Sequence, residues 1–92
     1  MIRSFRHKGL KRLFETGSTR MVSPDLVGQL IRQLDVLNRA VTVQDVNLPG
    51  YRLHELKGDR KGTWSVMVSG NWRLTFTFHD RDAYDVDLEG YH

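Results

Sequence analysis

Three runs of alternating apolar and polar residues in the C-terminal third constrain the fold of this 92-residue chain most strongly. Alternation with a period of two is typical of strands that bury one face, and the segments 69–71 and 79–82 between the runs supply turn residues. The apolar positions are Trp64, Val66 and Val68, then Trp72, Leu74, Phe76 and Phe78, then Tyr84, Val86 and Leu88. We therefore expect an antiparallel meander whose apolar face, including both tryptophans and Tyr84, turns to the core.

A short amphipathic helix is predicted near the N-terminus. Leu10, Leu13 and Phe14 recur at helical spacing within residues 6–16, and Gly17 supplies a stop. The preceding residues 2–5 are expected to form a short strand. The basic face of this helix is more typical of a solvated surface than of a phosphate site.

A second helix is predicted from Ser23-Pro24-Asp25 to about Arg39. A capping hydroxyl, a proline in the first turn and an acid near the positive end of the dipole all favour a helix start. Gly28 inside it costs about 1 kcal/mol relative to alanine, so either another element approaches closely there or the helix tolerates the loss. The expected core-facing stripe is Leu26, Val27, Leu30, Ile31, Leu34 and Leu37.

These elements together predict an α+β fold, with the meander packed on two N-terminal helices. Residues 40–50 lack clean alternation and are expected to form a connecting loop with one short turn. Ninety-two residues suffice for one core, so residues 1–92 are expected to be a single domain.

The composition favours an intracellular protein that binds a polyanion. The chain has no cysteine, and no apolar run approaches the ~18 residues of a membrane span. Its net charge of +3 is divided, because residues 1–20 carry six basic side chains against one acid, whereas residues 79–92 carry five acids against one arginine. This basic front (residues 1–20) and acidic tail (residues 79–92) fit a protein that binds a polyanion on one surface and makes a different contact on another.

The segment before the meander places an imidazole and an ammonium on one face. Leu53 and Leu56 would face opposite sides of a regular strand, so a bulge or a strand end near Glu55 is needed to bring both to the core. The same irregularity puts His54 and Lys57 together on the polar face.

Counting by twos assigns further candidates to that face: Arg73 and, if the last strand continues to the terminus, Tyr91, with His92 at the edge. RNA cleavage through the 2'-hydroxyl needs a proton acceptor, cations for the phosphate oxygens and an acid for the leaving oxygen. Histidine can accept or donate the proton near neutrality, so these residue types fit that chemistry. No histidine spacing suggests a metal, and neither a metal nor a cofactor is expected.

Each candidate also has a structural explanation. A lone strand histidine is more often a surface residue than a catalyst, and the alternative role for Arg73 is a simple ion pair with Asp85 or Asp87. Residues 58–62 fit a charged turn equally well. Unpaired carboxylates on the final strand would also repel phosphate.

The chain nevertheless resembles the HigB toxins, the "killer protein" branch of the RelE/ParE superfamily. The resemblance covers essentially the whole chain in order and length. It is carried by residues 1–5 (MIRSF), 13–17 (LFETG), 52–60 (RLHELKGDR) and 72–76 (WRLTF), and by the closing Tyr91-His92.

This resemblance implies a bacterial cytoplasmic type II toxin with a RelE-like fold that cleaves mRNA on the 70S ribosome and inhibits translation. It implies neutralisation by a HigA-like helix-turn-helix antitoxin, and contact with operator DNA only through the antitoxin complex. No membrane partner is implied. The implied catalytic residues are His54, Tyr91 and His92, and Lys57 and Arg73 stand where the family presents basic side chains to RNA.

One position departs from the family pattern. Relatives can carry an aspartate directly before the terminal Tyr-His, where this chain has Gly90. Either Glu89 or the terminal carboxylate substitutes for it, or the aspartate only orients its neighbours, or activity is weak.

Two other functions compete with the ribonuclease. A ParE-like inhibitor of DNA gyrase needs no proton-transfer residues, so the Tyr91-His92 ending argues against it. A non-catalytic RNA-binding or protein-binding module is favoured by Gly90.

Overall fold

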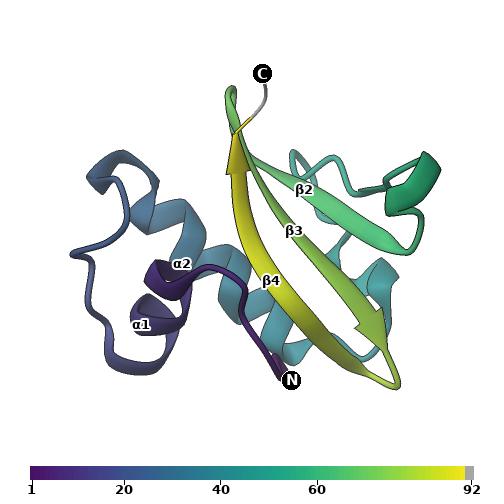
Figure 1. The fold of residues 1–92 in the computed structure, drawn as a ribbon, viewed down its shortest axis with the longest axis horizontal. Helices are drawn as coiled ribbons and strands as arrows, with labels where there is room; N and C mark the ends of the chain where they lie inside the picture. Colours follow the sequence, from purple (N-terminus) through teal and green to yellow (C-terminus); the bar gives the residue numbers. More distant parts are fainter. Residues whose placement is uncertain (91–92) are drawn as a thin grey trace.

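The computed structural model describes residues 1–90 of the chain. Two α-helices precede four strands, with a 3₁₀ turn before β1 and another before β2 (Figure 1). The elements are α1 (Lys8–Thr16), α2 (Pro24–Arg39), η1 (Val43–Val46), β1 (His54–Glu55), η2 (Gly58–Arg60), β2 (Thr63–Ser69), β3 (Trp72–His79) and β4 (Asp82–Gly90).

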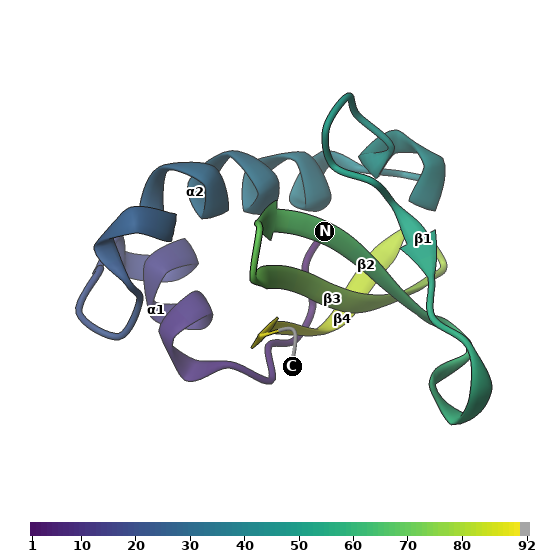
Figure 2. The ribbon, with the colours of Figure 1, turned by 90° about the horizontal axis from the view of Figure 1, so that it is seen from above.

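The four strands form one antiparallel sheet in the order β1-β2-β3-β4. Figure 2 shows α2 lying across one face of this sheet, with α1 beside it near the end of β4. The α+β class, the meander and its packing on two helices are therefore confirmed. Among residues 1–90, no helix is both long and apolar enough to cross a bilayer.

The apolar stripe with which α2 covers the core is narrower than the sequence predicts. Pro24 begins it as expected, but the Ser23 side chain makes no capping hydrogen bond. Ile31 is wrongly predicted as core, because 52% of it is exposed. The buried leucines of the stripe are Leu26, Leu30, Leu34 and Leu37.

Gln33 takes a core position that its polarity would not predict. It is 1% exposed, and its Nε2 donates a 2.7 Å hydrogen bond to the Met67 carbonyl oxygen on β2. This bond compensates the loss of water from the amide nitrogen and fixes α2 against the sheet, whereas the buried amide oxygen has no hydrogen-bond partner among residues 1–90.

The helix α1 begins at Lys8, two residues later than the predicted Arg6. Its cap explains the difference, since the Leu10 N–H donates to His7 Nδ1 over 3.1 Å. It ends as predicted at Gly17, whose left-handed φ of 76° lets its N–H reach the Leu13 carbonyl oxygen at 3.0 Å.

The N-terminal segment runs parallel to β4 and contacts it at two isolated bridges, Ile2 with Ala83 and Phe5 with Val86. The terminal ammonium and Arg3 both reach Asp82, at 3.1 and 3.0 Å. Part of the basic front therefore pairs with the acidic tail, whereas the sequence suggested separate partners for the two.

A bulge in β4 overturns one predicted alternation. Thr75 lies opposite Asp87, but Thr77 lies opposite Tyr84, so three steps along β4 match two steps along β3. This stretch of β4 therefore holds one extra residue, and Asp85 within it has a left-handed φ of 53°. Tyr84 therefore lies on the polar face opposite Thr77. Its expected place in the core belongs to Ala83, which is fully buried.

The two tryptophans also differ from each other. Trp64 is partly buried against the core as predicted, whereas Trp72 at the start of β3 is 39% exposed. Its strand partner is Gly90, which offers no side chain to cover the indole. The prediction that both tryptophans are core residues is wrong for Trp72.

Two helical glycines give a matched test of this packing. A Cβ at Gly9 would lie 2.7 Å from the Met21 carbonyl oxygen, whereas at Gly28 the nearest atom is the Arg32 Nη1 at 3.9 Å. Gly9→Ala should therefore destabilise the fold by about 1–3 kcal/mol. Gly28→Ala should stabilise it by roughly 0.5–1 kcal/mol, because α2 tolerates this glycine without a packing need. Urea unfolding of both variants would measure these changes in unfolding free energy. Equal changes of the same sign in the two variants would contradict the prediction.

Candidate functional site

The sheet face away from α2 carries the candidate functional residues. Register alone aligns one row across all four strands, because His54 pairs with Ser65, Ser65 with Thr75, and Thr75 with Asp87. Directly paired residues point to the same side of a sheet, so His54 on β1 shares the face of β3 and β4 on which Thr75 and Asp87 lie.

His54 is exposed on β1, and its Nδ1 lies 3.1 Å from the Arg52 carbonyl oxygen. A carbonyl oxygen only accepts hydrogen bonds, so this contact needs the proton on Nδ1. The neutral ring then carries its lone pair on Nε2, where it can accept a proton. Arg52 has a φ of 52°, an uncommon conformation that aims this carbonyl.

Arg73 lies on the same open face, one row from Thr75 and opposite Glu89. The register puts its Cα about 12 Å from that of His54, so the two side chains extend onto one surface from different strands. Lys57 is exposed and lies outside the strands as the N-cap residue of η2. The predicted strand end at Glu55 is confirmed, and it separates His54 on β1 from Lys57 in the following loop.

The predicted residues Tyr91 and His92 lie outside the described residues. The described chain ends with β4 at Gly90, which pairs with Trp72.

Glu89 is the most heavily bonded carboxylate on this face. Its Oε1 and Oε2 accept 2.7 and 2.6 Å bonds from the two terminal nitrogens of Arg60, in a bidentate pair. The Thr75 hydroxyl donates to Oε2 at 2.5 Å, and Arg73 Nη2 lies 3.5 Å from Oε1. Arg73 therefore pairs with Glu89, where the sequence offered Asp85 or Asp87.

These contacts fix the charge of Glu89. The Arg60 hydrogen bonds, with lesser help from Thr75 and Arg73, outweigh desolvation and lower the pKa of Glu89 from 4.5 to about 2. Glu89 is therefore ionised at neutral pH and a weak proton acceptor. The sequence offers Glu89 as one substitute for the aspartate that relatives can carry before Tyr91-His92. Its low pKa disfavours that alternative, because Glu89 is poorly suited to transfer protons.

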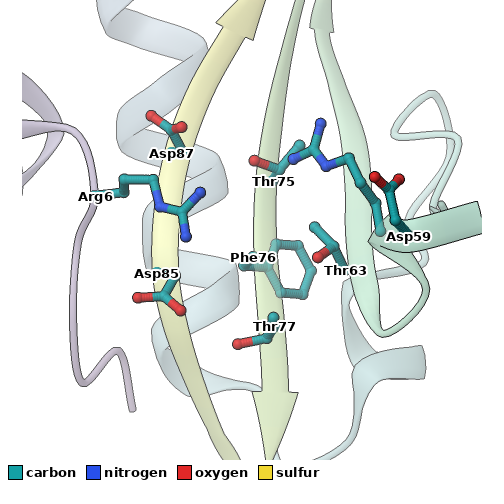
Figure 3. Close-up of a pocket in the computed structure, with 9 residues that line it drawn as sticks. Arg6, Asp59, Thr63, Thr75, Phe76, Thr77, Asp85 and Asp87 are labelled. Atoms are coloured by element: carbon teal, nitrogen blue, oxygen red, sulfur yellow. The ribbon is translucent and has the colours of Figure 1, made fainter.

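A polar cavity of about 230 Å³ continues the open face beyond this cluster (Figure 3). The threonines of β2 and β3 form its floor, and Figure 3 shows Arg6 extending between Asp85 and Asp87 on its β4 side. It is lined by Arg6, Asp59, Arg60, Thr63, Thr75, Phe76, Thr77, Asp85 and Asp87.

The sequence did not single out Arg60 or Thr75. Arg60 belongs to the segment 58–62, which also fits a charged turn, and its partner Glu89 lies 29 residues away in the chain. The sequence does indicate the side on which Thr75 lies, because Thr75 and Arg73 are polar positions of the same alternating run. Its near-complete burial, at 2% exposed, depends on the side chains that cover it.

Comparison with known proteins identifies the family. The model of the HigB-like toxin family, described as the RelE-like toxin of type II toxin-antitoxin system HigB, matches residues 3–92. The chain belongs to the HigB-like toxin family. It is 47% identical to Endoribonuclease HigB of Proteus vulgaris over 92 residues, covering 100% of both chains. It is 30% identical over 91 residues to Toxin HigB-1 of Vibrio cholerae, covering 97% of this chain and 96% of the relative.

The fold agrees with this family. A mutant of YafQ from E. coli matches with a TM-score of 0.60 at 18% identity, over 98% of this chain and 91% of that one. The resemblance stated from the sequence is therefore confirmed, as is the RelE-like fold. Membership in a toxin-antitoxin family means that the chain has an antitoxin partner.

The bonding of Glu89 predicts a specific acid sensitivity. Its folded pKa lies below its ordinary value, so its contribution is complete above pH ~4.5 and is lost as the pH falls toward 2. The difference in unfolding free energy between the wild type and Glu89→Gln should shrink by roughly 2–3 kcal/mol between pH 5 and pH 2. Urea titrations would measure it, with Glu15→Gln on exposed α1 as the control. A difference that does not vary with pH would contradict the assignment.

Proposed function

We propose that this type II toxin is an endoribonuclease that cleaves mRNA on the ribosome and inhibits translation in the bacterial cytoplasm. The observation that carries the proposal is the 47% identity, over the full length of both chains, with a protein named Endoribonuclease HigB. The open face of the sheet supports it by combining an exposed histidine on β1 with Arg73 on β3.

The proposed partner is a HigA-like helix-turn-helix antitoxin, which would bring the toxin to operator DNA only indirectly. The 70S ribosome would supply the mRNA in a constrained conformation. Such positioning suits a site whose His54 and Arg73 lie on different strands of one face, because the substrate must extend between them.

In the proposed reaction, His54 Nε2 takes the proton of the 2'-hydroxyl. The 2'-oxygen then attacks phosphorus, and the bond from phosphorus to the 5'-oxygen breaks. His92 returns a proton to that 5'-oxygen with Tyr91 assisting, which leaves a 2',3'-cyclic phosphate and a 5'-hydroxyl. Lys57 and Arg73 stabilise the additional charge on the phosphate oxygens in the transition state. No step in this sequence calls for a cofactor.

Cleavage of mRNA on programmed ribosomes would test the function and the site together. Removing an acid or base group should slow single-turnover cleavage by about 10²- to 10⁴-fold, so His54→Ala, Tyr91→Ala and deletion of His92 should each lose activity. His79→Ala is the matched control, because His79 is also an exposed strand histidine but lies at the far end of β3.

Undiminished cleavage by all three variants would overturn the site assignment. Inhibition of DNA gyrase by a wild-type protein that leaves ribosome-bound mRNA intact would overturn the function itself.

A further inference from the structure

We propose that Glu89 is a positioning residue that holds Arg60 and Arg73 together as a two-arginine phosphate clamp, in which Arg60 is an additional substrate-binding residue. This inference rests on the proposed function. It adds Arg60 and Glu89 to the residues that the sequence assigned.

The first support is the geometry of the carboxylate. Glu89 accepts bonds from both terminal nitrogens of Arg60 and also lies 3.5 Å from Arg73 Nη2, so one side chain orients two guanidinium groups. The Thr75 hydroxyl, bonded to Oε2 at 2.5 Å, fixes the carboxylate in turn. Thr75 is 2% exposed on the central strand β3, which makes it a rigid support.

The second support is the set of hydrogen-bond donors that Arg60 keeps beside Glu89. The bidentate contact occupies one N–H from each Arg60 terminal nitrogen, whereas arginine has five N–H donors. The Arg60 side chain is 38% exposed and can offer remaining donors to a phosphate, for which a planar guanidinium is well matched.

The third support is the way in which the loop is tethered. Arg60 is the last residue of the three-residue turn η2, and Gly58 at its start and Gly62 after it have left-handed φ values of 72° and 96°. The Glu55 carboxylate accepts a 2.8 Å bond from the Gly62 N–H at one end of this loop. The pair between Arg60 and Glu89 ties its middle to β4 and so restricts the loop that begins at Lys57.

A purely structural ion pair explains less of this arrangement. Stability alone needs only the pair between Arg60 and Glu89, and it does not explain why Arg73 lies beside the same carboxylate. A network that gathers two cations around one anion on the open face is better suited to prearranged binding of a second anion.

Single-turnover cleavage at saturating programmed ribosomes would test this role. Glu89→Gln keeps the shape of the side chain but loses its charge, and it should slow cleavage by about 10- to 100-fold, because misplacing a binding group by ~1 Å can cost ~10²-fold. Arg60→Lys should slow cleavage similarly although its charge is kept, because an ammonium cannot form the two-pronged contact. Arg60→Ala in the Glu89→Gln background should cost less than it does in the wild type.

The ion pair between Asp35 and Arg39 on α2 gives a matched control. It joins the same types of groups at 3.1 Å but lies outside the sheet, so Asp35→Asn and Arg39→Lys should leave cleavage within twofold of the wild type. Thermal unfolding would establish that every variant is folded at the assay temperature.

Cleavage by Glu89→Gln within twofold of the wild type, or a loss that matches its unfolded fraction, would overturn the inference while leaving the proposed function intact. Full activity of Arg60→Ala would do the same. Absence of cleavage by the wild type would overturn the proposed function and the inference together.

Discussion

Coverage of one sheet face by α2 determines where the candidate side chains on the strands of this toxin lie. The buried leucines of α2 pack into one cluster with Val66, Leu74 and Phe76, which removes that face from water. Side chains alternate along a strand, so the residues between these core positions must turn to the open face. Arg73, Thr75 and Glu89 are therefore carried by the strands that form the core. Their backbone positions are as well determined as the core itself.

The bulge in β4 depends on a part of the chain that is far away in sequence. Asp85 is the extra residue, and its N–H donates to the Ser4 hydroxyl at 2.9 Å instead of to a partner on β3. The N-terminal segment thus satisfies a donor that the bulge displaces from the ladder. Aspartate tolerates the left-handed conformation better than most residues, which explains how the bulge is accommodated at this position.

Local sequence signals predicted the elements of this fold but not the contacts between distant ones. Helix periodicity, the Pro24 start and the Gly17 stop depend on neighbouring residues, and those predictions are confirmed within one turn. The exposure of Ile31 and the burial of Gln33 depend on which side of α2 contacts β2. Periodicity alone does not determine that contact. Tyr84 was misplaced because a bulge shifts the alternation without leaving a distinctive residue pattern.

The candidate site was predictable to the same extent. Period counting correctly placed Arg73 on the face of His54, since both assignments need only the strand register. It could not predict that Arg60 crosses from η2 to Glu89, because a charge pair 29 residues apart is set by how the loop folds back. The roles of Tyr91 and His92 remain predictions from the family resemblance.

The acidic character of β4 is compatible with RNA binding because its carboxylates are not equivalent. Glu89 is bound by Arg60 and lies beside Arg73, so its negative charge is compensated by two guanidinium groups. Farther along β4, Arg6 extends between Asp85 and Asp87 and offsets part of their charge (Figure 3). Asp87 and Asp59 also act on Arg60, so the face has no uniform positive potential. Binding of RNA there would depend on the individual arginines that compensate each carboxylate.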